Sequence, residues 1–374
     1  MKRHINYYFL TLVALLLLAG ILFLATLSSL TSLNFFGNTN YYLFRQLVRI
    51  LIGVVLCVIV FKIPLPFLKK ISPILLVVNL LFLTFVFLPF IGVNFWGATR
   101  WISIGAITFQ PSEFLKISAI LYLAALVSNR FSEHSKKGWA ALAKKSYDNL
   151  RRLFIPFLLL LLIITVILYY QKDLSTLLIT VASLIVVYFV AGTPLLHMVL
   201  AFLIAATSAV FFIARESYRI ERLKVFFNPE IDPLGIGLQM KQSLIAIGSG
   251  GIFGKGLGMS VQKFGFLPQA MTDSIFAIIG EETGIVGTSL LILSFLLFFW
   301  LGLKIANSAT DKFSKLTAIG ITFWITSQAF MNVASAIGLF PLSGIPLPFF
   351  SYGGSHIISE LIGVGILLNI SKNG

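Results

Sequence analysis

The chain is poor in cysteine, in histidine and in acidic residues. Its 374 residues include one cysteine and four histidines, and 13 Asp and Glu stand against 28 Lys and Arg. The single cysteine, Cys57, excludes an internal disulfide framework and a thiolate metal site. The histidines are scattered and show no ligand spacing. No cofactor is indicated, the metal content is unknown, and a divalent cation stays possible.

Charged residues of either sign are also scarce. Only 11% of the residues are charged and 58% are hydrophobic, whereas about a quarter of a soluble domain is charged. A single core cannot enclose so much apolar surface, so most of that surface must face lipid. Runs such as TLVALLLLAGILFLATLSSL (11–30) are long enough for membrane-spanning helices. They lack the short alternating segments of outer-membrane barrels.

The apolar runs predict an all-α polytopic membrane protein that forms one domain over residues 1–374. The first run follows Lys2 and Arg3, is too long for a signal-peptide core and is interpreted as an uncleaved span. The ten expected spans lie near 8–29, 43–61, 72–91, 112–128, 153–169, 174–191, 194–214, 275–303, 316–338 and 346–370.

Lysine and arginine gather in alternate loops, which indicates the orientation because such residues favour the cytoplasmic side. With ten spans, the N-terminus and these loops fall on one side, so both termini are expected in the cytoplasm. The net charge of +15 then reflects topology and suits anionic lipid head groups, and no nucleic-acid partner is expected. The basic loop residues are Lys62, Lys69, Lys70, Arg130, Lys136, Lys137, Lys144, Lys145, Arg151, Arg152, Lys304, Lys312 and Lys315.

Two long loops remain for the outer face, residues 92–111 and residues 215–273, the latter between the seventh and eighth spans. Long connections are usually functional or disordered. The composition of 215–273 predicts ordered, partly membrane-lying segments, including a short amphipathic helix in GLQMKQSLIAIGSGG (237–251) that glycine ends. The run GSGGIFGKGLG (248–258) lacks the Gly-Lys-Ser/Thr order of a nucleotide-binding loop. A flexible turn is favoured there, although backbone beside Lys255 and Lys263 can meet a lipid-linked phosphate.

Three of the scarce acids stand together in FGFLPQAMTDSIFAIIGEETG (264–284). Asp273 lies at the start of the eighth span, where an aspartate can cap the helix or take part in catalysis, and the residues alone favour neither. Glu281 lies about 12 Å deeper along a helix, next to Glu282. Intramembrane acids indicate function or a buried partner, and pairing with Lys or Arg of another span is the favoured interpretation for both glutamates.

Other polar residues near the outer face have a structural and a functional interpretation each. Arg100 and Trp101 can anchor the interface, and an arginine there can also bind pyrophosphate. Lys116 can pair with Glu113 along one helix or present a cation to a cavity. Asp173 is expected to cap the sixth span.

The last outer segment, FPLSGIPLPFFSYGGSHIISE (340–360), combines three prolines with two adjacent glycines. Broken backbone at membrane depth is tolerated where it lines a cavity. Ser351, Ser355 and Glu360 would make that cavity polar.

Four motifs together resemble the SEDS family, named for shape, elongation, division and sporulation. The resemblance runs in order from about residue 8 to 371, and GLGMSVQKFGFLP (256–268) is closer to the FtsW branch than to RodA. The motifs are RWISIGAITFQPSEFLKI (100–117), NPEIDPLGIGLQMKQSLIAIGSGGIFGKGLG (228–258), FLPQAMTDSIFAIIGEETGIVG (266–287) and GIPLPFFSYGGS (344–355).

The resemblance implies an enzyme of the bacterial cytoplasmic membrane that polymerises lipid II into glycan strands on the outer face. It also implies a class B penicillin-binding protein as the transpeptidase partner, with other division or elongation proteins nearby. Asp273 matches the family's essential acid, Arg100, Trp101 and Lys116 match functionally important positions, and Ser351 matches a motif serine. Met271, Ser274 and Glu360 depart from the family pattern.

The implied reaction joins the 4-hydroxyl of one lipid-linked disaccharide to the anomeric carbon of another, with inversion, and releases undecaprenyl pyrophosphate. A carboxylate such as Asp273 can act as the general base. Arg100, Lys116, loop cations or a metal ion can stabilise the departing charge. Two other functions stay open, a flippase that moves lipid II without chemistry and a scaffold for division proteins.

Overall fold

A computed structural model describes residues 5–89, 91–95, 98–105, 107–130, 150–215, 217–232 and 235–373. The basic residues expected at 2–3 and at 136–145 therefore lie outside the described residues. The elements are α1 (Tyr7–Phe36), α2 (Tyr41–Lys62), α3 (Leu65–Phe85), β1 (Gly92–Phe95), β2 (Ala98–Ile104), β3 (Ile107–Phe109), α4 (Pro111–Arg130), η1 (Leu150–Phe154), α6 (Ile155–Tyr170), α7 (Leu174–Val190), α8 (Leu195–Arg215), α9 (Ser217–Phe227), η2 (Pro229–Ile231), α10 (Ile236–Ser249), η3 (Gln262–Phe264), α11 (Ile275–Ser308), α12 (Lys312–Ala336) and α13 (Gly354–Asn373).

Each of the ten expected spans overlaps a helix, and the polytopic helical class is confirmed. Seven helical segments in the described part of the chain are long and apolar enough to cross a membrane by length and composition: α1, α2, α3, α4, the stretch Arg151–Tyr170 that joins most of η1 to α6, α11 and α13. The helix α7 is apolar but has 17 residues. The backbone N of Asn6 donates to Ser371 Oγ, so the two ends of the chain lie together, as an even number of spans would require.

Several helix boundaries and one loop differ from expectation. The tenth span was expected from residue 346, but α13 begins only at Gly354, because the prolines at 346 and 348 lack the N–H that a helix interior needs. The third helix begins at Leu65 and keeps Pro73 inside it. The loop 92–111, expected on the outer face, holds a small antiparallel sheet of order β1-β2-β3, which the sequence analysis did not foresee.

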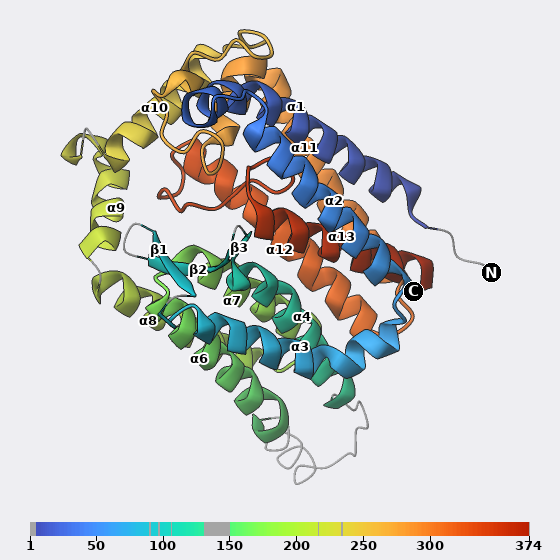
Figure 1. Cartoon of the computed structure of the whole chain (residues 1–374). Helices are drawn as coiled ribbons and strands as arrows, with labels where there is room; N and C mark the ends of the chain where they lie inside the picture. The colour runs from blue at the N-terminus through green and yellow to red at the C-terminus, as the bar shows by residue number, and fades with distance from the viewer. Residues whose placement is uncertain are drawn as a thin grey trace.

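Two helices form the centre of the molecule. In Figure 1, α12 and α13 lie between a group that contains α1, α2 and α11 and a group that contains α3, α4, α6 and α7. Of the 18-residue apolar stretch of each helix, 83% is buried in α4 and in α13 but only 11% is buried in α2. Polar side chains on α4, α12 and α13 are therefore held inside protein, whereas α2 offers most of its surface to lipid.

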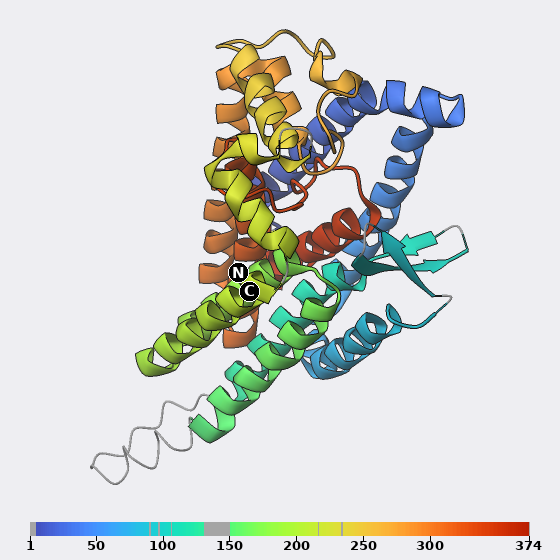
Figure 2. The same cartoon turned by 90° about the vertical axis from the view of Figure 1, so that its left-hand side faces the viewer.

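The long connection between α8 and α11 is ordered where it is described. Its helix α10 ends at Ser249 with Gly250 as the C-cap residue, which confirms the short helix expected there. Figure 2 shows α10 and the following loop at the top of the molecule, α9 below them, and the small sheet at the right-hand edge.

The helix α11 is interrupted at Gly284, where φ is 65° and ψ is −161°. Only glycine adopts this backbone conformation readily. After the break, the N–H groups of Ile285 and Val286 donate to the carbonyls of Gly251 and Ile252 at 3.0 and 3.1 Å. The break thus attaches the glycine-rich loop that follows α10 to the side of α11.

Candidate functional site

Asp273 lies just before α11, but its side chain is not the cap of that helix. The N-cap position is Ser274, and it makes no side-chain capping hydrogen bond. The carboxylate of Asp273 instead points to a neighbouring loop, because a Cβ added at Gly344 would lie 3.4 Å from its Oδ2. The capping interpretation of Asp273 therefore loses its geometric basis.

The backbone around Asp273 is fixed by the proline-containing turn before α13. Asn332 Nδ2 donates to the carbonyl of Asp273 at 2.8 Å and to that of Ile345 at 2.7 Å. Ser351 Oγ donates to the carbonyl of Thr272 at 2.6 Å, and the N–H of Tyr352 donates to that of Met271 at 2.8 Å. The acid is thus held in place through its main chain.

Two arginines bring positive charge to the Asp273 carboxyl. Burial raises the pKa of Asp273 above its ordinary value, and the Thr272 hydroxyl and the charges of Arg222 and Arg100 oppose that rise. Arg222 comes from α9 and donates to the carbonyl of Leu342 at 2.8 Å. Among the described residues no ion pair within 4.0 Å includes Asp273. A carboxylate with a raised pKa is suited to accept a proton near neutral pH.

Arg100 reaches the site from strand β2. Its Nε donates to the carbonyl of Gln171 at 3.4 Å, and its Nη2 donates to that of Lys172. Its Nη1 lies 4.0 Å from Asp173 Oδ1. The Arg100 side chain is 32% exposed, so its guanidinium is held by two backbone carbonyls yet stays accessible. Its neighbour Trp101 pairs with Val93 across the sheet.

Asp173 is a helix cap, as expected. Its carboxylate accepts from the N–H of Thr176, at the start of α7, at 3.3 Å and from Ser112 Oγ at 3.0 Å. Gln110, two residues before Ser112, donates its backbone N–H to Ser355 Oγ at 2.8 Å. Asp173 therefore joins the starts of α4 and α7 near Arg100.

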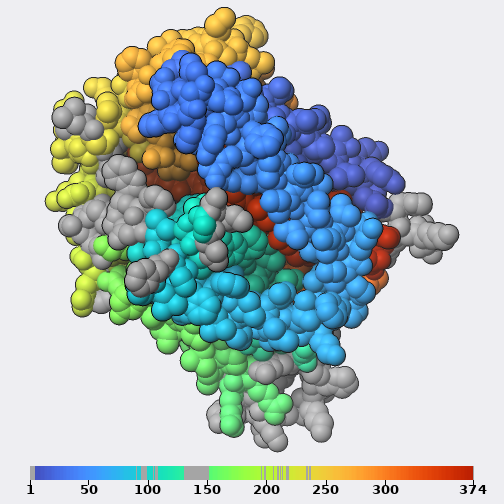
Figure 3. Space-filling model, in the orientation of Figure 1, coloured from blue at the N-terminus to red at the C-terminus, as the bar shows by residue number. Residues whose placement is uncertain are grey.

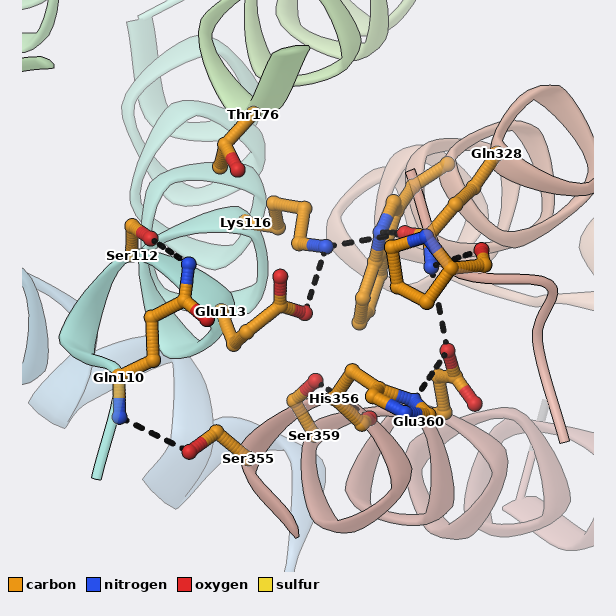
Figure 4. Close-up of polar contacts among 12 residues, drawn as sticks. Gln110, Ser112, Glu113, Lys116, Thr176, Gln328, Ser355, His356, Ser359 and Glu360 are labelled. Atoms are coloured by element: carbon orange, nitrogen blue, oxygen red, sulfur yellow. Dashed lines mark hydrogen bonds and ion pairs between the residues drawn. The ribbon is translucent and has the colours of Figure 1, made fainter. Parts of the chain in front are cut away.

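Lys116 lies in a buried network rather than at an open surface. Its Nζ is 2.8 Å from Glu113 Oε2 and 2.9 Å from Gln328 Oε1, and its side chain is 2% exposed. Figure 4 shows that this network continues through Gln328 to Glu360 and His356 on α13. The expected pair with Glu113 is present, and direct contact of Lys116 with a substrate stays a prediction.

Glu281 and Glu282 hold the loop that follows α10. Glu281 accepts from Lys255 Nζ at 2.7 Å, from the backbone N–H groups of residues 261 and 262 at 3.1 and 3.2 Å, and from Ser260 Oγ. Glu282 Oε1 lies 3.9 Å from Lys263 Nζ. The expected pairing with a cation is found, but the lysines belong to the outer loop and not to another span.

The structure brings only part of the expected site together. Asp273 and Ser351 lie together at the turn that precedes α13, and the charge of Arg100 acts on Asp273. Lys255 and Lys263 instead face the glutamates of α11. Sequence reasoning did not single out four residues that complete the arrangement. Three of them are amides inside apolar helices: Gln46, Gln328 and Asn332. Their position was the available signal, because buried polar groups in a membrane need partners. The fourth, Arg222, was one of several basic residues in its loop.

Two further features bear on ligands. An apolar cavity of about 400 Å³ lies among α6, α7 and α8, and its lining includes Leu174, Leu177 and Phe212. In Figure 3 the C-terminal residues are seen in a hollow between the blue and the cyan parts of the surface. No group of three or more His, Cys, Asp or Glu that could hold a metal occurs among the described residues.

Comparison with known proteins gives consistent results along the whole chain. The cell cycle protein family model of FtsW, RodA and SpoVE matches residues 6–374. The stage V sporulation protein E of Bacillus subtilis (strain 168) is 37% identical over 358 residues, which cover 96% of this chain and 94% of that protein. A probable peptidoglycan glycosyltransferase FtsW of Trichlorobacter lovleyi is 37% identical over 355 residues, or 94% of this chain and 89% of the relative.

Solved structures have the same fold. A chain from a peptidoglycan synthase complex described as coordinating polymerization and crosslinking aligns with a TM-score of 0.75 and 24% identity, covering 98% of this chain and 97% of that chain. The rod shape determining protein RodA of Thermus thermophilus aligns with a TM-score of 0.70 and 24% identity, covering 98% and 96%.

Proposed function

The chain belongs to the FtsW, RodA and SpoVE family of cell cycle proteins, and we propose that this peptidoglycan glycosyltransferase polymerises lipid II with Asp273 as its general base. Each step joins the 4-hydroxyl of one lipid-linked disaccharide to the anomeric carbon of another, with inversion. The new glycosidic bond forms as the bond to the pyrophosphate breaks. The proton of the hydroxyl passes to Asp273, and undecaprenyl pyrophosphate leaves with the electron pair.

The observation that carries this proposal is the state of Asp273. Its main chain is fixed by Asn332 and by the turn before α13, but its carboxylate neither caps α11 nor has an ion-pair partner among the described residues. Fixed position together with a free proton-accepting group is what a general base requires. Burial raises the pKa of this carboxyl, which strengthens it as a base.

The leaving group needs positive charge, and Arg100 and Arg222 supply it in this proposal. Both lie close enough to Asp273 to lower the pKa of its carboxyl. Arginine suits a pyrophosphate because its planar fork of donors matches phosphate oxygens. A divalent cation can add to this charge when the substrate brings one. Stabilising a departing anion with groups already in place lowers the barrier directly.

The apolar surroundings suit a substrate with a long isoprenoid tail. The cavity among α6, α7 and α8 is apolar, and its lining includes Leu174, the residue after Asp173. Asp173 in turn lies beside Arg100. A lipid with its tail in this cavity would therefore have its phosphates near an arginine.

The proposal places the site on the outer face of the bacterial cytoplasmic membrane. In a Cys57→Ser background, Leu257→Cys should react with an impermeant thiol reagent in whole cells, and Lys70→Cys should not. Both side chains are exposed, but Leu257, in the loop after α10, and Lys70, near the start of α3, are assigned to opposite faces. The reverse pattern would rule out chemistry on the outer face.

A class B penicillin-binding protein is the proposed partner. The synthase complex of similar fold is described as coupling polymerization to crosslinking, and we extend that coupling to this chain. Co-purification of the two proteins in mild detergent tests it, and full activity without any such complex would argue against a required partner.

Purified protein incubated with lipid II and no transpeptidase decides between polymerisation and transport. Glycan strands on a gel are the expected product. If the protein instead only moves lipid II across a vesicle membrane, the flippase alternative holds. If the protein shows neither polymerisation nor transport, the scaffold alternative remains.

A further inference from the structure

Glu360 is a fully buried acid on α13 that the proposed chemistry does not use. It has 0% relative exposure and lies on a helix whose 18-residue apolar stretch is 83% buried. A carboxylate is costly at such a position unless it has partners. Its role should therefore be visible in what it binds.

Glu360 binds the turn before α13 directly through Phe349 and indirectly through Gln328, which also binds that turn. Its Oε2 accepts from the backbone N–H of Phe349 at 3.0 Å. Its Oε1 accepts from Gln328 Nε2 at 3.2 Å, and the same Gln328 amide also donates to the carbonyl of Pro346 at 3.2 Å. His356 Nδ1 lies 3.4 Å from Oε1. Figure 4 shows Glu360, His356 and Gln328 facing one another between α12 and α13.

The residue that Glu360 binds has an unfavourable backbone. Phe349 has a φ of 67°, which is a rare conformation for a bulky residue. Such a conformation persists only when the surroundings hold it. A hydrogen bond from an N–H to a buried carboxylate is stronger than one between neutral groups, so Glu360 is the group best placed to hold Phe349 in this conformation.

The turn that contains Phe349 is the one that fixes Asp273. Ser351 Oγ accepts from the N–H of Leu347 at 2.8 Å and donates to the carbonyl of Thr272 at 2.6 Å. Thr272 directly precedes Asp273. The contacts therefore run from Glu360 through Phe349 and Ser351 to the backbone beside the acid.

We propose that Glu360 is a positioning residue, which holds the turn of residues 345–352 in the conformation that places Asp273 for catalysis. The effect of Glu360 on catalysis rests on the proposed function, but its effect on the conformation of the turn does not. Glu360 itself touches no reacting atom. Loss of its charge should let the turn relax and should displace the backbone of residues 271–273.

The test compares Glu360→Gln with Ser359→Ala. Glutamine keeps the size of the side chain but has one acceptor oxygen for two donors, and its own N–H₂ opposes the amide of Gln328. Ser359 is the adjacent buried residue on α13, and its hydroxyl bonds only within the helix, to the carbonyl of His356 at 2.8 Å. Ser359→Ala is therefore a matched control that leaves the turn alone.

Hydrogen exchange measured by mass spectrometry tests the positioning without any assay of activity. We expect faster exchange in Glu360→Gln for the amides of residues 345–352 and also of residues 270–274, and no change there in Ser359→Ala. Unchanged exchange at 270–274 would overturn the proposal, even if the protein polymerises lipid II.

Kinetics test the catalytic consequence. In Glu360→Gln, kcat per folded protein should fall by about tenfold to a hundredfold with little change in KM, since small misplacements of a reacting group have effects of this size. Adding Ser351→Ala should lower kcat little further, because both changes act through one turn. Wild-type kcat in Glu360→Gln, or fully multiplicative effects of the two changes, would overturn it. Failure of wild-type protein to polymerise would instead count against the proposed function alone.

Discussion

Asp273 and Glu281 are eight positions apart on one stretch of chain, yet their surroundings are opposite. Glu281 has 0% relative exposure and accepts from a lysine, a serine and two backbone N–H groups of the loop that follows α10. Asp273 is partly exposed, and the firm contacts around it are made by its main chain. One carboxylate is fully used by the fold, and the other is available.

The difference separates two reasons for an acid in an apolar protein. A buried carboxylate with all its lone pairs occupied organises structure, because removing it leaves several donors without a partner. A carboxylate that is fixed in position but free to take a proton can do chemistry. Sequence position alone does not distinguish these cases, since both acids lie at or inside the same apolar run. The predictions below test the two assignments separately.

The largest effect is expected at Asp273. We expect Asp273→Asn to lower the rate of lipid II polymerisation by about 10² or more while the protein stays folded, because asparagine keeps the shape but cannot accept the proton. The measurement is strand formation by purified protein, with detergent chromatography to check folding. Near wild-type strand synthesis by Asp273→Asn would end the general-base assignment.

Asp311→Asn is the matched control for this variant. Asp311 is a true helix cap, since its carboxylate accepts from the N–H of Ser314 at 3.0 Å at the start of α12. Asparagine caps helices about as well as aspartate, so this variant should retain its activity. Equal losses in both variants would indicate that helix capping, rather than proton transfer, explains the result at position 273.

Glu281 should affect stability before chemistry. Glu281→Gln places an N–H₂ group among the donors that bond a fully buried carboxylate, and each buried donor left without an acceptor costs about 1–3 kcal/mol. We expect a lower unfolding temperature in detergent and faster proteolysis near residue 257, with kcat of the surviving folded protein close to wild type. A stable variant that is catalytically dead would transfer the chemical role from Asp273 to Glu281.

Much of the helical fold can be predicted from the sequence because long apolar runs have one stable form in lipid. The start of α13 was wrong by eight residues because the apolar run continues through prolines that cannot join a helix. The sheet of β1 to β3 was missed because strands of 4, 7 and 3 residues give little periodic signal.

The candidate site was predictable only in its individual residues. Asp273 and Arg100 were marked by their types and places in the loops, but the contribution of Arg222 depends on how α9 packs. The lysine partners of Glu281 and Glu282 were assigned to another span, since nothing local indicates that the loop turns back to the break at Gly284. Contacts between residues distant in sequence carry the information that local patterns lack.

A smaller effect is expected when one of the two arginines is removed. The Arg222 charge lowers the pKa of Asp273, so Arg222→Gln should raise that pKa further. A general base works only when deprotonated, and activity should therefore fall off at a higher pH on the acidic side than in wild type. The measurement is the pH profile of kcat/KM, and Lys224→Gln, an exposed neighbour on α9, should leave the profile in place. If the acidic limb of the profile stays at the same pH or shifts to lower pH, Arg222 does not act on the pKa of the base.

The smallest effect is expected at Lys255, and it decides whether the loop that follows α10 binds substrate or only packs. The Lys255 side chain is 35% exposed, and exposed ion pairs contribute only about 0–1 kcal/mol. Lys255→Met keeps the apolar part of the side chain while three donors to Glu281 remain, so we expect a small, salt-dependent loss of stability. We also expect a KM for lipid II within about twofold of wild type, as for a group with no role in binding. Lys263→Met provides the comparison, because Lys263 faces Glu282 in the same loop. A severalfold rise in KM for either variant, with unchanged stability, would instead show that this loop meets the phosphates of the substrate.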